Sequence, residues 1–302
     1  MNSSRSQQRR ERHRRYKLPR LTATMTCQEA FRTIARGCLD DLVENQQATC
    51  EGNREALHQM RIALTRLRGA RSFFSSSIPS SEWSPLKGEL KWLNKHLSQA
   101  RDLDVALKRL SSVEDTSPQQ SLDRVWRKTW STSHRELSRA LHSRRYRILL
   151  RDMLIWMENG NRSPDSLKPS TSLTTYSDRQ LDRWYKKLIK KSRAFDDMNA
   201  GQRHRLRIQS KRLRYALETL GQLLPSKSHA KVREFLKSLR KIQKCLGQLN
   251  DAEQGRAIAT TLATRDDGAR SRSLFPTGRK ARKRMIKAAA LTFRQMAELK
   301  PF

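Results

Sequence analysis

The sequence predicts an all-α protein made of two related halves. Apolar residues recur at helical spacing through most of the 302 residues, and no alternating pattern typical of a strand ladder stands out. The pattern H-x-x-R-I-x-x-x-R-L-R begins at His58 and again at His204. A second match follows each copy, in HLSQARDLDVAL and CLGQLNDAEQG, and aligns Asp102 with Asp251. We therefore expect two pseudo-symmetric four-helix bundles that arose by internal duplication.

The first half is expected over residues 21–158, after a basic and disordered arm at residues 1–20 that lacks apolar periodicity. Its first helix, CQEAFRTIARGCLDDLVEN, places Phe31 and Ile34 on one face. The second helix contains the repeated basic segment. A third ends at RDLDVALKRL after the breaker PSSEW, and the loop TSPQQS precedes a helical stretch over residues 122–158.

The second half is expected over residues 178–302, after a linker at 159–177 that is rich in Ser, Thr and Pro. LDRWYKKLIK gives its first helix, and a second begins near Gly201 and carries the other basic segment. LLPSKS breaks that helix, and FLKSLRKIQKCLGQL forms the third. A basic loop at 265–284 then precedes a last helix at 285–298.

Charge is the most unusual property of the composition. The chain carries 64 Lys and Arg against 29 Asp and Glu, which gives a formal net charge of +35 and a pI near 11.2. Such an excess is typical of proteins that bind a polyanion: a nucleic acid, an anionic membrane face or a phosphate polymer. Hydrophobic residues still make up 36% of the chain, so a core can form and general disorder is not expected.

The sequence predicts a cytoplasmic location. The four cysteines form no C-x-x-C pair, so neither a disulfide framework nor a zinc site is expected. No apolar run approaches the roughly 18 residues of a spanning helix, and the N-terminus lacks the apolar stretch of a secretory signal. No membrane partner is expected, and the sequence predicts no particular oligomeric state.

On a helix, the repeated segment separates a polar stripe from an apolar one. The polar stripe has these members: His58, Arg61, Thr65 and Arg68 in the first copy, and His204, Arg207, Lys211 and Arg214 in the second. Arg can grip two phosphate oxygens with its planar fork, Lys adds a mobile charge, and a protonated His donates from both ring nitrogens. Two such stripes facing each other would form a basic groove or pore that suits an extended polyanion.

Further lysines at helical spacing are candidates for the same surface. They are Lys91 and Lys95 in the first half and Lys237, Lys241 and Lys244 in the second. Their stripe lies nearly opposite the apolar face of its helix, so a solvated surface is the competing interpretation. They would line the groove only if the two halves met on that side.

Two acidic residues, Asp102 and Asp251, are candidates either for metal ligands or for partners that fix arginine rotamers, and the second role is favoured. Arg66 and Arg212 lie off the polar stripe and are left unassigned. Each half offers one stripe histidine, and no carboxylate stands at a spacing that would orient it. The sequence therefore predicts no metal, no cofactor and no catalytic residue.

Taken together, these segments resemble the CHAD family, an α-helical domain named for its histidines. The similarity rests on LHQMRIALTRLRGARSFF, LSQARDLDVAL, HRLRIQSKRLRYALE and LRKIQKCLGQLND, and extends over nearly the whole chain after the basic arm. It implies two related four-helix bundles and a basic central surface that binds inorganic polyphosphate, in some members at polyphosphate granules. The first copy departs from the family's basic motif at Thr65. The motif carries over onto His58, Arg61, Arg68, His204, Arg207, Lys211 and Arg214.

The leading hypothesis is a non-catalytic protein that binds inorganic polyphosphate. Nucleic-acid binding is the second: the charge permits it, but the stripes lack interleaved aromatic residues and no DNA-binding motif is recognised. An enzyme or accessory factor of polyphosphate metabolism is the third. Phosphoryl transfer usually needs divalent metal held by converging carboxylates, and the stripes contain none.

Overall fold

The computed structural model describes residues 18–78, 80–110, 119–159, 172–262 and 279–301, and within these ranges every regular element is a helix. The prediction of an all-α fold is therefore confirmed. The helices are α2 (Cys27–Glu44), α3 (Gln46–Cys50), α4 (Arg54–Phe73), α5 (Ser80–Leu110), α6 (Gln119–His142), α7 (Arg144–Asn159), α8 (Leu173–Ser192), α9 (Ala200–Leu220), α10 (His229–Leu262) and α12 (Arg279–Leu299), with short 3-10 turns at Gly221–Leu223 and Ser226–Ser228.

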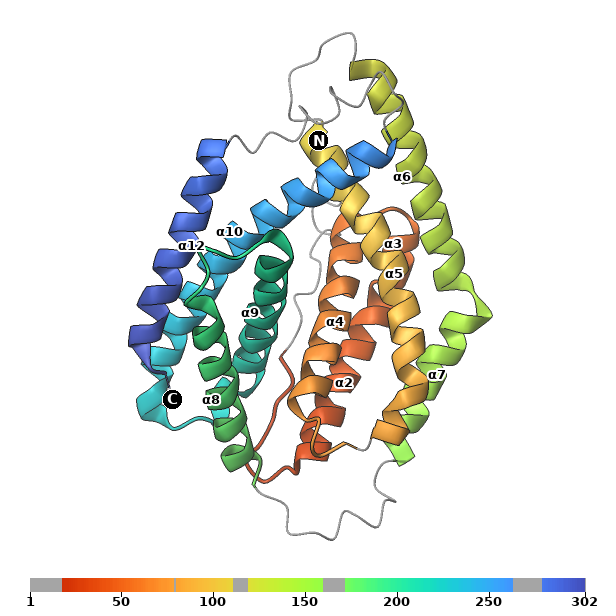
Figure 1. Ribbon diagram of the computed structural model, residues 1–302. Coiled ribbons are helices and arrows are strands. Elements are labelled where there is room, and N and C mark those ends of the chain that lie inside the picture. Colours follow the sequence, from red (N-terminus) through yellow and green to blue (C-terminus); the bar gives the residue numbers. More distant parts are fainter. Residues whose placement is uncertain (1–17, 79, 111–118, 160–171, 263–278, 302) are drawn as a thin grey trace, which may run out of the picture.

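The helices form two groups that lie side by side (Figure 1). We call α2 to α7 the first half and α8 to α12 the second half. The halves meet where α4 packs against α9 and α5 against α10, so both helices that carry the repeated basic segment lie at this interface. Buried apolar residues from both halves belong to one continuous core.

An aromatic cluster joins the halves beside the C-terminal end of α4. Phe73 contacts Trp184 edge-on at 5.3 Å between ring centroids, and Phe74 stacks on Tyr176 at 5.7 Å. The Tyr176 hydroxyl also donates a hydrogen bond of 2.7 Å to the carbonyl oxygen of Phe73. Aromatic pairs of this kind contribute beyond their buried area, so they hold α4 and α8 in a fixed relation.

Side-chain caps begin the two helices that carry the basic segments. Asn53 accepts hydrogen bonds from the backbone nitrogens of Glu55 and Ala56 at the start of α4, and Asn199 forms a capping box with Gln202 at the start of α9. Both helices then bury the apolar stripe that the sequence indicates, namely Met60, Leu64 and Leu67 on α4 and Leu206, Leu213, Leu217 and Leu220 on α9. The polar stripe, which lies beside the apolar stripe on each helix, therefore stays outside the core of its own half.

Three elements have other boundaries than the sequence indicates. The helical stretch at 122–158 is broken into α6 and α7, because the Ser143 hydroxyl accepts a hydrogen bond from the Tyr146 nitrogen and starts a new helix. Helix α8 begins at Leu173, inside the predicted linker, because Ser172 caps it. Helix α12 begins six residues before the predicted Met285, in a run of Lys, Arg and Ala, which are good helix formers.

Other predictions fall on residues outside the described part of the chain. These are most of the basic arm, the start of the TSPQQS loop, most of the linker and most of the loop at 265–284. The four cysteines are free thiols, and Cys27 and Cys38 are buried. Within the described ranges, none of the helices combines the length and the apolar character needed to cross a bilayer.

Candidate polyanion-binding site

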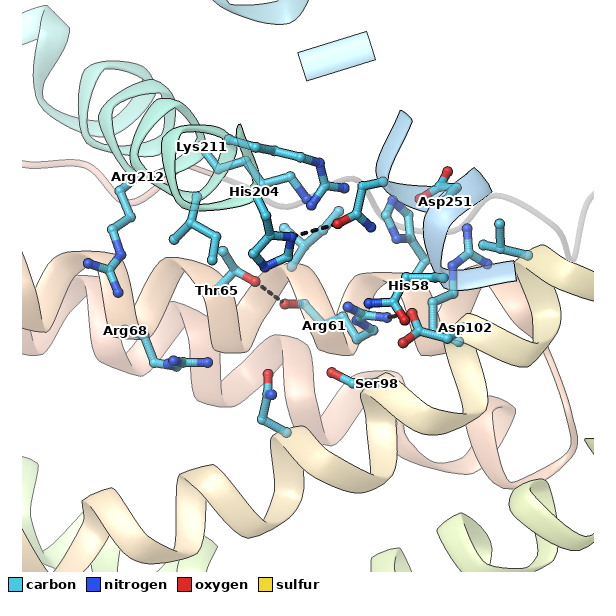
Figure 2. Close-up of a pocket in the computed structure, with 18 of the residues that line it drawn as sticks. His58, Arg61, Thr65, Arg68, Ser98, Asp102, His204, Lys211, Arg212 and Asp251 are labelled. Carbon is cyan, nitrogen blue, oxygen red and sulfur yellow. Dashed lines mark hydrogen bonds and ion pairs between the residues drawn. The ribbon is translucent and has the colours of Figure 1, made fainter. Parts of the chain in front are cut away.

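A cavity of about 460 Å³ lies where the two halves meet (Figure 2). Its walls come from α4 and α5 of the first half and from α9 and α10 of the second half. The lining residues are His58, Arg61, Ile62, Thr65, Arg68, Asn94, Ser98, Arg101, Asp102, Val105, His204, Arg207, Ile208, Lys211, Arg212, Tyr215, Asn250, Asp251 and Gln254.

The two polar stripes come together in this cavity. Seven of their eight members line it: His58, Arg61, Thr65 and Arg68 from α4, and His204, Arg207 and Lys211 from α9. Figure 2 shows Arg68 and Arg212 at one end of the view and Asp102 and Asp251 at the other. Among the described residues of the lining, six are Arg or Lys and two are Asp, so positive charge exceeds negative charge by four with neutral histidines.

Arg214 is the stripe residue that does not line the cavity. Its guanidinium lies over the Tyr215 ring, 4.5 Å from the centroid, and 3.7 Å from the Glu218 carboxylate. The Glu218 carboxylate also pairs with Arg240 at 3.2 Å. The first copy has Gly69 where the second has Tyr215, so it lacks the ring, and its equivalent arginine, Arg68, lies in the cavity instead.

The five predicted lysines lie outside the cavity lining. All of them are exposed on the surface: Lys91 and Lys95 on α5, and Lys237, Lys241 and Lys244 on α10. The charged residues that α5 and α10 contribute to the cavity are Arg101, Asp102 and Asp251, and none of the predicted lysines is among them. Their part in binding stays a prediction.

Asp102 is bound to an arginine of the cavity. Its carboxylate accepts a hydrogen bond from Arg61 Nη1 at 3.3 Å, which confirms that this residue pairs with an arginine. Burial raises the pKa of Asp102, the Arg61 charge opposes that rise, and the nearby Asp251 adds to it. Elsewhere in the described part of the chain, as here, no three His, Cys, Asp or Glu side chains converge as a metal site would require.

The two stripe histidines have different surroundings. His204 Nδ1 lies 2.6 Å from the Asn250 amide oxygen and acts as the donor in that hydrogen bond. Burial, together with the nearby Arg101 and Lys211 charges, lowers the pKa of His58 to about 4. His58 is therefore neutral in the empty cavity at neutral pH.

Lys211 and Arg207 lie in a cluster of cations that have few counter-ions. Burial, together with the charges of Arg207 and Arg61, lowers the pKa of Lys211 to about 7, while Asp251 acts in the opposite direction. The pKa of Arg207 is also lowered, chiefly by burial. Buried cations that destabilise one another are stabilised by an anion placed among them.

Several lining residues were missed by the sequence prediction. Asn94, Ser98 and Arg101 lie on one face of α5 beside Asp102, at spacings of four and three residues, and this polar face could have been recognised. Arg212 was left unassigned, yet it lines the cavity. Its counterpart Arg66 lies instead over the Tyr215 ring, 5.2 Å from the centroid, at the interface between the halves.

The profile of the CHAD domain family matches residues 33–260. The chain belongs to the CHAD family. The crystal structure of the CHAD domain from the plant Ricinus communis is similar to this protein with a TM-score of 0.80 and 28% sequence identity, over 93% of this chain and 96% of that one. PptA from Streptomyces chartreusis shares the fold, with a TM-score of 0.63 and 13% identity over 91% of this chain and 100% of that one. No curated protein matches the CHAD chain described here at a significant level.

Proposed function

We propose that this CHAD protein binds inorganic polyphosphate in the cavity between α4 and α9, without hydrolysing it. The observation that carries the proposal is that both copies of the basic segment line one cavity. An extended anion placed there meets cations on two opposite walls, and each arginine fork can hold two phosphate oxygens. The excess of six cationic over two anionic lining residues supports a polyanion over a small neutral ligand.

An internal duplication would explain why both walls carry the same motif. In this proposal each half derives from a four-helix unit, with α4 equivalent to α9 and α5 equivalent to α10. The first half has in addition the short α3, and its last helix is divided into α6 and α7. The match of Arg61 with Arg207 and of Asp102 with Asp251 supports this equivalence, since each pair lines the cavity from opposite halves. Because the two walls carry similar residues, they can contact a ligand that is itself a chain of repeating phosphates.

Binding without turnover is supported by the surroundings of the histidines. A histidine that acts as a base is usually oriented by a carboxylate. His204 is instead hydrogen-bonded to the neutral amide of Asn250, and the pKa of His58 is lowered among cations. We expect no release of orthophosphate when the protein is incubated with polyphosphate, which a colorimetric phosphate assay measures.

The binding test compares the wild type with two triple variants. Replacement of Arg61, Arg68 and Arg207 by Gln removes three cations of the cavity, and we expect affinity for long-chain polyphosphate to fall by at least about a hundredfold. Replacement of Arg36, Arg147 and Arg151 by Gln removes the same charge from exposed positions of α2 and α7 and is the matched control. Equal affinities of the two variants at the same salt concentration would contradict the proposal.

Competition distinguishes polyphosphate from nucleic acid. The exposed lysines of α5 and α10 could attract any polyanion, with a steep dependence on salt. We expect long-chain polyphosphate to displace duplex DNA, RNA and ATP at physiological salt. A long bare chain of phosphates can meet the cations of both walls at once, whereas nucleic-acid phosphates carry bulky nucleosides and ATP has only three phosphates. Displacement of polyphosphate by DNA would favour the nucleic-acid hypothesis. In cells, a fluorescent fusion should then co-localise with cytoplasmic polyphosphate granules.

A further inference from the structure

The two halves differ in how they supply positive charge to the cavity. The second copy of the basic segment has Lys211 where the first has Thr65, whose hydroxyl is used in a hydrogen bond to the Arg61 carbonyl oxygen at 2.8 Å. On the next helix the difference is reversed: α5 has Arg101 where α10 has the neutral Asn250. Both Arg101 and Asn250 line the cavity.

Arg101 lines the cavity, and two contacts hold its guanidinium. Its Nη1 donates a hydrogen bond of 3.3 Å to the Arg54 carbonyl oxygen and lies 3.8 Å from Asp104 Oδ2. The Arg101 side chain is 25% exposed, and its charge acts on His58 across the cavity wall. Its position is therefore determined by α4 and by its own helix, α5, rather than by solvent.

Asp104 is a buried carboxylate that several groups fix in place. It is 1% exposed, and its Oδ1 accepts hydrogen bonds from Trp130 Nε1 at 2.8 Å and from His134 Nε2 at 3.1 Å. Arg54 Nε lies 3.7 Å from the same oxygen. A buried carboxylate must be paired and hydrogen-bonded to be tolerated, and the donors from α6 leave its second oxygen directed at Arg101.

The equivalent position in the second half has another arrangement. Glu253 replaces Asp104, is 31% exposed, and pairs with Arg282 of α12 at 3.8 Å. Asn250, in the place of Arg101, is occupied by its hydrogen bond to His204. The buried carboxylate with a cation beside it is thus a feature of the half that lacks the stripe lysine.

We propose that Arg101 is a further polyanion-binding residue, which supplies the cation that Thr65 does not, and that Asp104 is its positioning residue. This inference rests on the proposed function, since it assigns residues to the same cavity. The carboxylate attracts one side of the guanidinium and leaves the other N–H groups available to phosphate oxygens. Each half then contributes three cations to the cavity lining: Arg61, Arg68 and Arg101 from the first, and Arg207, Lys211 and Arg212 from the second.

The first experiment measures affinity for long-chain polyphosphate in a double-mutant cycle. We expect Arg101→Gln to weaken binding about tenfold, as loss of a charge-assisted contact does, while the exposed control Arg151→Gln has little effect. Asp104→Asn should also weaken binding, but not in a protein that already carries Arg101→Gln. If Asp104→Asn does not fold, Trp130→Phe removes one donor to the same carboxylate and should weaken binding only when Arg101 is present.

The second experiment follows His58 in the ligand-free protein by NMR titration. Arg101→Gln should raise the pKa of His58 towards its ordinary value, because the second-largest cause of its low value is removed. Asp104→Asn should raise it too if Arg101 moves away from the cavity. A carboxylate that only stabilises the fold would leave that pKa unchanged, or lower it through loss of a negative charge.

The outcomes separate the two proposals. If the wild type does not bind polyphosphate, the proposed function itself is wrong and the inference falls with it. If the wild type binds and Arg101→Gln binds as well as Arg151→Gln, the proposed function stands and Arg101 is not part of the site. If the two losses at Arg101 and Asp104 add fully, Asp104 does not act through Arg101.

Discussion

We expect the proposed polyphosphate binding to depend on pH through Lys211, in a range where a lysine normally does not titrate. Burial among Arg207, Arg61 and Arg214 lowers its pKa to about 7 in the empty cavity, with Asp251 acting in the opposite direction. A phosphate chain beside Lys211 would favour the charged form and move the pKa back towards the ordinary value of about 10.4. Polyphosphate binding would then take up a proton at any pH between these two values, so we expect affinity to fall as pH rises through that window.

The magnitude follows from the fraction of Lys211 that is charged before binding. With a pKa of about 7, roughly nine molecules in ten carry the charge at about pH 6 and roughly one in ten at about pH 8. The affinity should therefore decrease about tenfold between these two pH values. His58 is neutral before binding at both pH values, because its pKa is lowered to about 4, so the charge that the free cavity loses between them is that of Lys211.

The assay is isothermal titration calorimetry or fluorescence anisotropy at constant salt, with long chains so that the titrating terminal phosphates are a small part of the ligand. Lys211→Arg keeps its charge over this range and should bind with an affinity that does not change with pH. Lys211→Met should bind weakly at both pH values. A wild type whose affinity is flat between them, or rises with pH, would refute the reasoning.

Three other outcomes are expected. Lys211→Met should raise the melting temperature of the free protein near pH 7. A lysine whose pKa is lower in the folded than in the unfolded state makes the folded protein less stable below about pH 10, and the substitution removes this effect. Calorimetric scans at several pH values measure the change. Asp102→Asn should tighten polyphosphate binding a few-fold in the same titrations, because a carboxylate that competes for Arg61 is removed; weaker binding would show that Asp102 chiefly orients Arg61. Leu64→Ala should lower the free energy of unfolding by about 2–5 kcal/mol in urea, while Val43→Ala on the exposed face of α2 should change it by less than about 0.5 kcal/mol.

The stripe argument succeeded for α4 and α9 because helical spacing fixes which side chains share a face. His58, Arg61, Thr65 and Arg68 line the cavity together, as the spacing predicts. It did not place Arg214, since the direction of that side chain depends on the neighbouring Tyr215 ring and on Glu218, one turn further along α9. Spacing gives the face of a helix, whereas the rotamer depends on what surrounds it.

On α5 and α10, the sequence prediction selected residues outside the cavity and missed residues that line it. Lys91 and Lys237 are the kind of residue that charge counting selects, yet they lie on the exposed side, and Asn94, Ser98 and Asn250 were passed over because they are uncharged. Arg101 was also missed, since its counterpart in the repeat is not basic and the comparison of the two copies favours shared residues. A comparison of the two copies cannot reveal a lining residue that only one of them has.

The amino-acid sequence by itself determined the helical fold, the repeated basic segment and the excess of positive charge, because each depends on residue type and on spacing within a single helix. Only the tertiary structure decided that the two segments line one cavity, that Asp102 pairs with Arg61, and that the buried Asp104 carboxylate lies beside the Arg101 guanidinium. It also decided the low pKa of Lys211, since burial and the proximity of Arg207 and Arg61 arise only when the halves pack together. Electrostatic energies depend on distance and on exclusion of water, and neither exists before the chain folds.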